Sequence, residues 1–101
     1  MAAYVVVEVT ITDDEAYEKY KPLAYASIVA HGGRYLVRGG AVDSVEGDAV
    51  EARIVVLEFP DMEAARRWYR SDDYQAALSL REGAARSRLF MVEGVGGDVL
   101  G

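Results

Sequence analysis

The order of strand-like and helix-like segments constrains the fold of this chain more than any other feature. Segments that alternate apolar and polar residues, as strands do, cover residues 4–11, 34–38, 52–59 and 88–93. Between the first and second segments, and between the third and fourth, apolar residues recur at helical spacing instead. The predicted order is therefore β-α-β-β-α-β. Right-handed crossovers turn this order into the ferredoxin-like α+β fold, a four-stranded antiparallel sheet with helices on one face.

Capping residues indicate where the predicted helices begin and end. Thr12 is the expected N-cap of the first helix because it opens a capping-box sequence. Pro22 lies inside this helix and predicts a kink or a restart, whereas Gly32 is placed to end the helix in a left-handed conformation. Asp61 and Ser71 are the expected N-caps of two further helical segments.

Length and composition limit the domain count, the partners and the location. The 101 residues predict one domain over residues 1–95, followed by a flexible, glycine-rich tail over residues 96–101. The net charge of −6 argues against nucleic acid and anionic membranes as partners, since both require clustered basic surface. The absence of cysteine excludes thiol chemistry. No signal peptide or membrane-spanning stretch is recognisable, so the cytoplasm is the expected location.

Both faces of the predicted sheet carry apolar residues. One face of each strand is mainly apolar and is expected to pack against the helices. The opposite face is predicted to hold Tyr4, Val6, Glu8 and Thr10, then Arg34, Leu36 and Arg38, then Ile54, Val56 and Glu58, and finally Leu89, Met91 and Glu93. An exposed apolar patch of this size usually marks an interface, and the chain has no spare helix to cover it. The sequence therefore predicts a homodimer whose sheets pack face to face about a two-fold axis.

The ionisable residues on that second face leave two interpretations open. Glu8, Glu58 and Glu93 could pair with Arg34 and Arg38 for structural reasons alone, because buried charges are tolerated when they are matched. Alternatively, these groups line a small pocket that orients a polar ligand. In this second interpretation Arg34 and Arg38 bind an anionic group of the substrate.

The segment H-G-G-R-Y-L-V-R-G-G, residues 31–40, brings polar groups next to sharply bent backbone. His31 is the only histidine, and near a helix C-terminus it could be a cap or a general acid–base. Glu93 is the second candidate for proton transfer, and Tyr17 and Tyr74 are candidates to bound a substrate ring. A single histidine makes a poor metal site and no nucleotide-binding glycine pattern is present, so neither metal nor cofactor is expected. The polar cluster of Arg81, Glu82, Arg86 and Arg88, before the last strand, could bind an anion, but surface pairing is the favoured interpretation.

Several segments together resemble one family over nearly the whole chain. They are Y-V-V-V-E-V, A-H-G-G-R-Y-L-V-R-G-G, V-V-L-E-F-P, S-D-D-Y-Q-A-A-L and S-R-L-F-M-V-E-G. From Tyr4 to Gly94 the chain resembles the domain of unknown function family 1330, a branch of the dimeric α+β barrel group. That group includes antibiotic-biosynthesis monooxygenases, muconolactone isomerases, stress-responsive barrel proteins and haem-dependent chlorite dismutases. The resemblance implies a ferredoxin-like monomer and a barrel dimer, but it implies no activity, and the histidine of the haem-binding relatives has no match here.

Two functional hypotheses follow from these observations. The first is a cofactor-independent enzyme, monooxygenase- or isomerase-like, that acts on a small polar or aromatic metabolite. Its pocket would lie between the sheet and the first helix, near the dimer seam. The alternative is a non-catalytic, small-molecule-binding or stress-related dimeric protein. Ligand stabilisation without turnover would favour the alternative.

Overall fold

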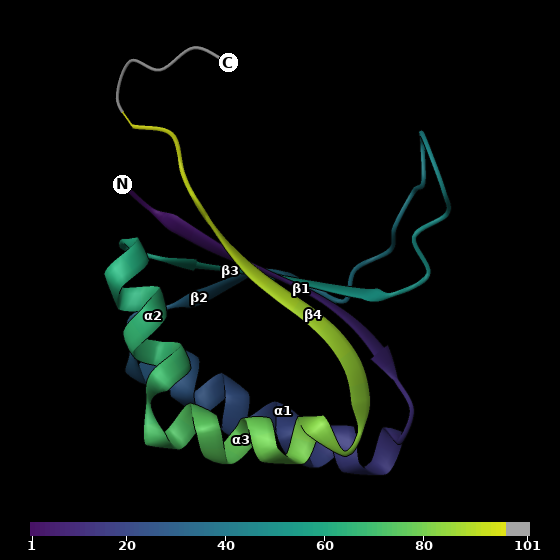
Figure 1. The fold of residues 1–101 in the computed structure, drawn as a ribbon, viewed down its shortest axis with the longest axis horizontal. Helices are drawn as coiled ribbons and strands as arrows, with labels where there is room; N and C mark the ends of the chain where they lie inside the picture. The colour runs from purple at the N-terminus through teal and green to yellow at the C-terminus, as the bar shows by residue number, and fades with distance from the viewer. Residues whose placement is uncertain (97–101) are drawn as a thin grey trace.

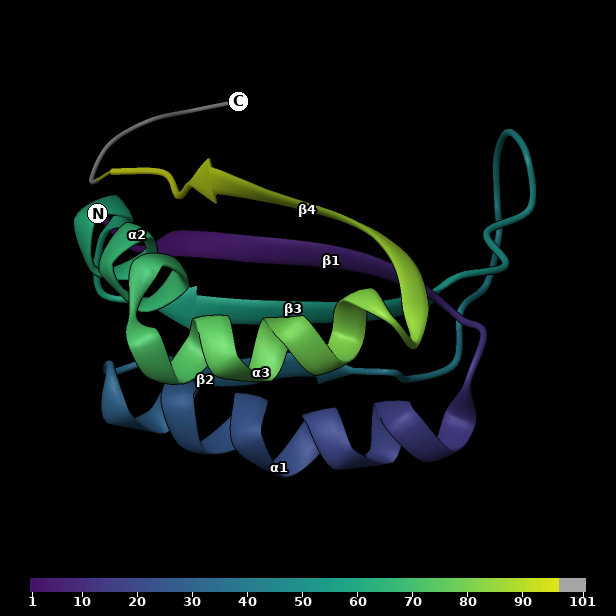
Figure 2. The same ribbon diagram turned by 60° about the horizontal axis from the view of Figure 1, so that its bottom comes forward.

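Four antiparallel strands form one sheet, and three helices cover one of its faces (Figures 1 and 2). The strands of this computed structural model, which describes residues 1–96, are β1 (Ala3–Ile11), β2 (Arg34–Arg38), β3 (Arg53–Phe59) and β4 (Ala85–Glu93). The helices are α1 (Asp14–Ala30), α2 (Met62–Arg70) and α3 (Asp72–Glu82). The order across the sheet is β2-β3-β1-β4, which confirms the predicted ferredoxin-like α+β fold.

The element boundaries agree with the predictions at most points. Asp61 and Ser71 are the N-caps of α2 and α3, and their side-chain oxygens accept hydrogen bonds from backbone N–H groups one turn later. Strand β4 begins at Ala85, earlier than predicted. The tail predicted as flexible lies outside the described residues from residue 97 onward. Among the described residues, no helix combines the length and the apolar character needed to cross a membrane.

The N-cap of α1 is Asp13 rather than the predicted Thr12. The Asp13 carboxylate accepts a hydrogen bond of 3.2 Å from the backbone N–H of Ala16. The N–H of Thr12 donates instead to the Ala84 carbonyl at 2.8 Å, which ties the end of β1 to the start of β4. Thr12 therefore lies in the connection between β1 and α1, and the N-cap is the next residue, Asp13.

Helix α1 continues through Pro22 and ends at a pair of glycines. Of the two alternatives predicted at Pro22, a kink or a restart, the restart does not occur, since the helix runs from Asp14 to Ala30 without interruption. Gly32 has the predicted left-handed conformation, with φ +79°. The N–H groups of Gly32 and Gly33 donate to the carbonyls of Val29 and Ile28, at 3.2 and 2.9 Å. This termination turns the chain directly into β2.

The core lies between the helices and the inner face of the sheet. The inner-facing residues of the two central strands are buried, namely Ala3, Val5, Val7 and Val9 with Val55, Leu57 and Phe59. The Trp68 ring packs against the rings of Phe59 and Tyr74, with centroid separations of 5.3 and 4.2 Å. The Trp68 indole N–H also donates to the Ser27 hydroxyl at 3.1 Å, which joins α2 to α1.

A β-bulge in β2 places Arg34 and Arg38 on opposite faces of the sheet. The register is Arg34↔Glu58, Tyr35↔Leu57, Val37↔Val56 and Arg38↔Val55, with a shift between Tyr35 and Val37. Residues directly opposite each other share a face, so Arg34 lies on the outer face and Arg38 on the inner face. The prediction that both arginines project from one face is wrong. The extra residue at the bulge, Leu36, shifts the alternation along the strand.

The faces of β4 are also the reverse of those predicted. Phe90 lies opposite Val6 on the outer face, whereas Leu89 and Met91 pack against the core. Glu93 lies opposite Ala3 and therefore belongs to the inner face rather than the outer one. Both alternations of this strand are apolar, so the pattern alone does not choose between them, and a shift of one residue exchanges the faces.

Among the described residues, no helix covers the outer face of the sheet, because all three helices lie on the opposite side (Figure 1). This face carries an outer apolar patch made of Val6, Val37, Ile54, Val56, Phe90 and Val92. Arg34 pairs with Glu58 at 2.7 Å, and Arg88 pairs with Glu8. Arg34 is therefore paired on this face, as the pairing interpretation predicts, whereas Arg86, opposite Thr10 on the same face, has no carboxylate within 4.0 Å among residues 1–96.

Candidate functional site

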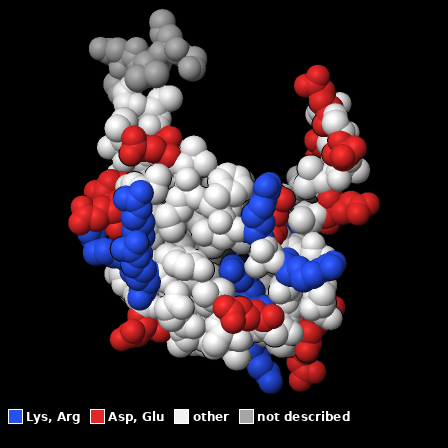
Figure 3. All heavy atoms as spheres, viewed as in Figure 1, with Lys and Arg blue, Asp and Glu red and all other residues white. Residues whose placement is uncertain are grey.

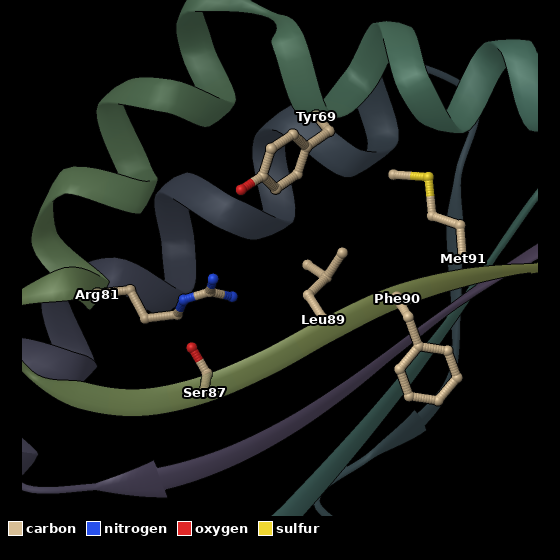
Figure 4. Close-up of a pocket in the computed structure, with 6 residues that line it drawn as sticks. All are labelled: Tyr69, Arg81, Ser87, Leu89, Phe90 and Met91. Atoms are coloured by element: carbon tan, nitrogen blue, oxygen red, sulfur yellow. The ribbon is translucent and has the colours of Figure 1, made fainter.

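Two cavities lie between the helices and the inner face of the sheet. The larger, here called the Arg81 cavity, has a volume of about 440 Å³ and opens between the α2–α3 segment and β4 (Figure 4). The smaller, here called the Arg53 cleft, has a volume of about 30 Å³ and lies where α1 packs on β2 and β3. Both combine positively charged side chains with tyrosine rings, so each is a candidate for binding a small molecule.

Arg81 supplies the charge of the larger cavity. It comes from the last turn of α3, is 6% exposed, and extends toward Ser87 of β4 (Figure 4). Within residues 1–96, no carboxylate lies within 4.0 Å of its guanidinium group. A buried charge without a partner is costly, and an anion that enters the cavity would remove that cost.

Two buried tyrosine hydroxyls lie beside Arg81. The hydroxyl oxygens of Tyr20 and Tyr74 are 3.1 Å apart, and the Arg81 guanidinium carbon lies 5.7 Å from the centre of the Tyr20 ring. Burial raises the pKa of both hydroxyls, and the positive charge of Arg81 opposes this shift only in part. Both tyrosines therefore remain neutral hydrogen-bond donors at physiological pH.

The remaining walls of the Arg81 cavity are largely apolar. Leu89 and Met91 point from β4 toward the helices, and the Tyr69 hydroxyl faces the same space (Figure 4). Phe90 borders the cavity, but its ring points away from Leu89 and Met91, in agreement with the register of β4. No histidine or carboxylate is among the lining residues. The cavity can hold and stabilise an anion, but it offers no ordinary general base.

The predicted catalytic residues lie in neither cavity. The ring nitrogen Nδ1 of His31 lies 2.8 Å from the Ser27 carbonyl oxygen, to which it can only donate, and 3.8 Å from the Asp73 carboxylate. These contacts support the interpretation of His31 as a helix cap. Glu93 is exposed at the end of β4. Their catalytic roles stay predictions, without support from this geometry.

The predicted binding residues are divided among three places. Arg34 is exposed on the outer face and paired with Glu58. Arg38 and Tyr17 both line the Arg53 cleft, which lies between the sheet and α1. Tyr74 is fully buried, and its hydroxyl forms a hydrogen bond with that of Tyr20, beside Arg81.

The candidate site residue whose burial was not predicted is Arg81. It was interpreted as one of a group of surface charges, but it is buried. The signal was present in the helical spacing, because Tyr74, Ala77, Leu78 and Arg81 form one stripe and the first three are buried. A charge that continues an apolar stripe is a candidate for a buried site.

A third hollow, of about 550 Å³, lies beside His31 and the arginines of α2. Figure 3 shows basic side chains gathered over α2, and acidic ones on the loop that projects between β2 and β3. Arg67 is paired with Glu63 at 3.2 Å, and both side chains are mostly exposed. Exposed pairs of this kind are solvated and contribute little, so this hollow is a weaker candidate than either cavity.

Comparison with known families settles the relationship of the chain. The profile of the domain of unknown function DUF1330 matches residues 2–95. The chain belongs to the DUF1330 family. The resemblance found in the sequence is thereby confirmed over nearly its whole length. No curated protein matches this DUF1330 chain.

Solved structures share the fold at low sequence identity. A protein of unknown function from Rhodopseudomonas palustris is 17% identical, with a TM-score of 0.76 over 95% of this chain and 84% of that chain. SnoaB, a cofactor-independent oxygenase from Streptomyces nogalater, is 12% identical, with a TM-score of 0.68 over 96% of each chain. A dimeric ferredoxin-like protein of unknown function from Jannaschia sp. CCS1 is 15% identical, with a TM-score of 0.65 over 93% of this chain and 100% of that chain. At such identities the likeness shows the fold alone.

Proposed function

We propose that this DUF1330 protein is a homodimeric, cofactor-independent enzyme that binds a small aromatic or polar metabolite in the Arg81 cavity and stabilises its anionic form. The observation that carries the proposal is the buried Arg81, which has no carboxylate partner among residues 1–96 and extends into a cavity of about 440 Å³. A guanidinium binds planar oxyanions through two parallel hydrogen bonds. The apolar walls formed by Leu89 and Met91 suit the ring or chain of such a ligand.

The chemistry that fits this cavity begins with an enolate or a phenolate. Isomerisation returns the proton to another carbon of that anion, and cofactor-independent oxygenation lets the anion react with dioxygen. In both reactions Arg81 would stabilise the negative charge in a water-poor site, where such stabilisation is strongest. No ordinary base lines the cavity. The substrate must therefore be acidic enough to lose its proton to water once Arg81 lowers its pKa. The likeness in fold to a cofactor-independent oxygenase supports this class.

The outer apolar patch supports the homodimer. Phe90 and Val92 are 39% and 47% exposed, and they adjoin Val6 and Val56 on a face that no helix covers among residues 1–96. Two copies packed through this face would exclude water from it and would leave both Arg81 cavities accessible on the helix sides. The dimeric relative of the same fold supports this arrangement. The absence of cysteine supports a reducing compartment such as the cytoplasm.

Salicylate, which carries both a carboxylate and a phenol, is a suitable probe for the Arg81 cavity. Amide NMR shifts at Ser87 and Leu89, which line this cavity, compare its binding there with that of salicylamide, which has nearly the same shape without the carboxylate. Arg81→Gln is expected to weaken salicylate binding by about 10- to 100-fold, as expected for the loss of charge-assisted hydrogen bonds. Arg67→Gln, an exposed arginine of α2, is the matched control and is expected to bind like the wild type. Equal binding by Arg81→Gln and wild type would refute the site.

Turnover decides between the enzyme and the alternative of a non-catalytic binding protein. The alternative is favoured by the absence of a histidine or carboxylate from the cavity walls. An oxygen electrode and product chromatography, applied to a panel of phenols and enolisable ketones, measure oxygenation and isomerisation. An enzyme is expected to lose turnover in Arg81→Gln and to retain it in Arg67→Gln. Tight binding of several panel members with no turnover of any would favour the binding protein.

A further inference from the structure

We infer that the Arg53 cleft is a second anion-binding site, distinct from the Arg81 cavity, that takes the carboxylate head of a small ligand. The cleft lies between α1 and the strands β2 and β3. Three positively charged side chains line it, those of Lys21, Arg38 and Arg53. None of these three lines the Arg81 cavity, so the inference does not depend on the proposed enzyme.

The three cations are held against tyrosine rings. The Arg38 guanidinium carbon lies 4.5 Å from the centre of the Tyr35 ring. The Arg53 guanidinium carbon and the Lys21 ammonium nitrogen lie 5.9 and 5.8 Å from the centre of the Tyr17 ring. These contacts orient the cations but leave their hydrogen-bond donors available, because a ring face accepts charge without occupying those donors.

No acidic residue lines the Arg53 cleft. Within the described part of the chain, neither Arg38 nor Arg53 has a carboxylate within 4.0 Å. Lys21 pairs only with Glu18, one turn away on α1, whose side chain is 67% exposed. The chain has a net charge of −6, yet these three positively charged side chains line one cleft without an acidic residue. A bound anion would neutralise part of that local positive charge.

One donor of a residue that lines the cleft is buried and makes no hydrogen bond. It is the Nε–H of Arg53, which has no partner in the structure. Nearly all buried polar groups in native proteins are paired, so an orphaned donor calls for a ligand or a water. The position of Arg53 depends on Gly39, where an added Cβ would lie 2.1 Å from a terminal nitrogen of the guanidinium. The glycine at the bulged end of β2 thus lets Arg53 lie flat against the backbone.

The volume of the cleft limits which chemical group of a ligand can enter it. A volume of about 30 Å³ accommodates roughly two waters, since one requires about 10–15 Å³ on this measure. The two oxygens of a carboxylate match that space and the fork of a guanidinium. The rest of the ligand would extend outward along the stacked rings of Tyr25 and Tyr35, whose centres are 6.1 Å apart and whose planes differ by 7°.

The test follows benzoate binding residue by residue, using amide NMR spectra of the ¹⁵N-labelled full chain at constant ionic strength. Benzoate is expected to shift the amide signals of Arg38 and Gly39. Arg53→Met, which keeps the aliphatic stem, and Arg38→Met are each expected to weaken this response by about tenfold or more, as for the loss of a charge-assisted hydrogen bond. Arg66→Met, an exposed arginine of α2, is expected to leave it unchanged.

Three results would overturn the inference: no shift at Gly39 in the wild type up to tens of millimolar benzoate, an unchanged response in Arg38→Met, or an equal loss in Arg66→Met. Arg38 is exposed, so its variant is expected to fold even if Arg53→Met does not. The Arg81→Gln protein is expected to keep the Gly39 response. That variant separates the two sites. If the proposed function is wrong, benzoate binding at the Arg53 cleft is unaffected. If the inference about the cleft is wrong, salicylate binding at the Arg81 cavity is unaffected.

Discussion

The inner and outer faces of the sheet are built from similar residues, yet helices cover only one of them. On β3, Leu57 is 2% exposed beneath the helices, whereas its neighbour Val56 points to the uncovered side and is only partly buried. At the edge of the same outer face, Phe90 is 39% exposed. An apolar strand therefore does not reveal which side is the core, because the covering element decides this. The apolar residues of the uncovered side remain available to pack against a partner.

The two faces also differ in how they hold charge. On the outer face each of two arginines has a carboxylate partner, in the pairs Arg34–Glu58 and Arg88–Glu8. On the inner side, Arg81 and Arg53 have no such partner among residues 1–96, and both border cavities. Matched charges suit an interface between two copies, whereas unmatched charges suit a ligand. The proposed homodimer would therefore use the outer face, and both proposed ligand sites lie on the inner side.

The largest expected effect that tests this comparison is that of Val56→Asp. The change places an unmatched carboxylate in the outer apolar patch, where burial between two copies would cost on the order of 3 kcal/mol or more. The dimer is expected to dissociate, with an association constant lowered by at least about a hundredfold. Sedimentation velocity over micromolar concentrations measures the change. Val45→Asp, in a loop position that is 82% exposed, is the control and should leave association intact. A wild-type monomer, or a variant that associates normally, would show that the outer face is not the interface.

An intermediate effect is expected from a pair of variants in β4. Phe90→Ala removes an outer contact and is expected to weaken the dimer by about 1–3 kcal/mol without destabilising the protomer. Met91→Ala removes a wall of the Arg81 cavity and is expected to lower the free energy of unfolding by about 1–3 kcal/mol, with association unchanged. Sedimentation and urea unfolding measure the two quantities. The opposite pattern would mean that the faces of β4 are reversed.

The smallest expected effect is a dependence of stability on alkaline pH. Burial raises the pKa of Tyr74, Tyr20 and Tyr35, so the native protein keeps three protons that the unfolded chain releases above about pH 10. Their stabilisation is complete below that pH. It is lost as the pH rises further, by at most about 1.4 kcal/mol per pH unit for each tyrosine. Urea unfolding between pH 8 and 11 measures the slope. Tyr74→Phe should reduce the slope and Tyr25→Phe, at a half-exposed ring, should not; equal slopes would contradict the assignment.

The sequence was sufficient wherever a local rule decides the structure. The element order, the caps at Asp61 and Ser71 and the left-handed Gly32 all follow from short-range chemistry, and all are present. The N-cap of α1 lies one residue later than predicted, at Asp13, and the backbone N–H groups of Thr12 and Asp13 both donate to the Ala84 carbonyl, at 2.8 and 3.0 Å. Local signals therefore locate a helix end to within a residue, and tertiary contacts select the final position.

The candidate site was only partly predictable. Arg38 and Tyr17, each predicted as a binding residue, line one cleft beside α1, whereas the shared face predicted for Arg34 and Arg38 is removed by a single bulge. Arg81 was missed because charges near a helix end are usually solvated. Its burial depends on β4 lying across the end of α3, a contact that no local pattern encodes.

The amino-acid sequence by itself determined the α+β class, the ferredoxin-like order of elements, the family and the presence of more apolar strand surface than one copy can cover. Tertiary structure alone decided which alternation of each edge strand faces the helices, and hence which arginines lie inside. The physical reason is the two-residue period of a strand. Either alternation of β4 is apolar enough to be buried, and one extra residue in β2 exchanges its faces, so only packing against the helices makes the choice.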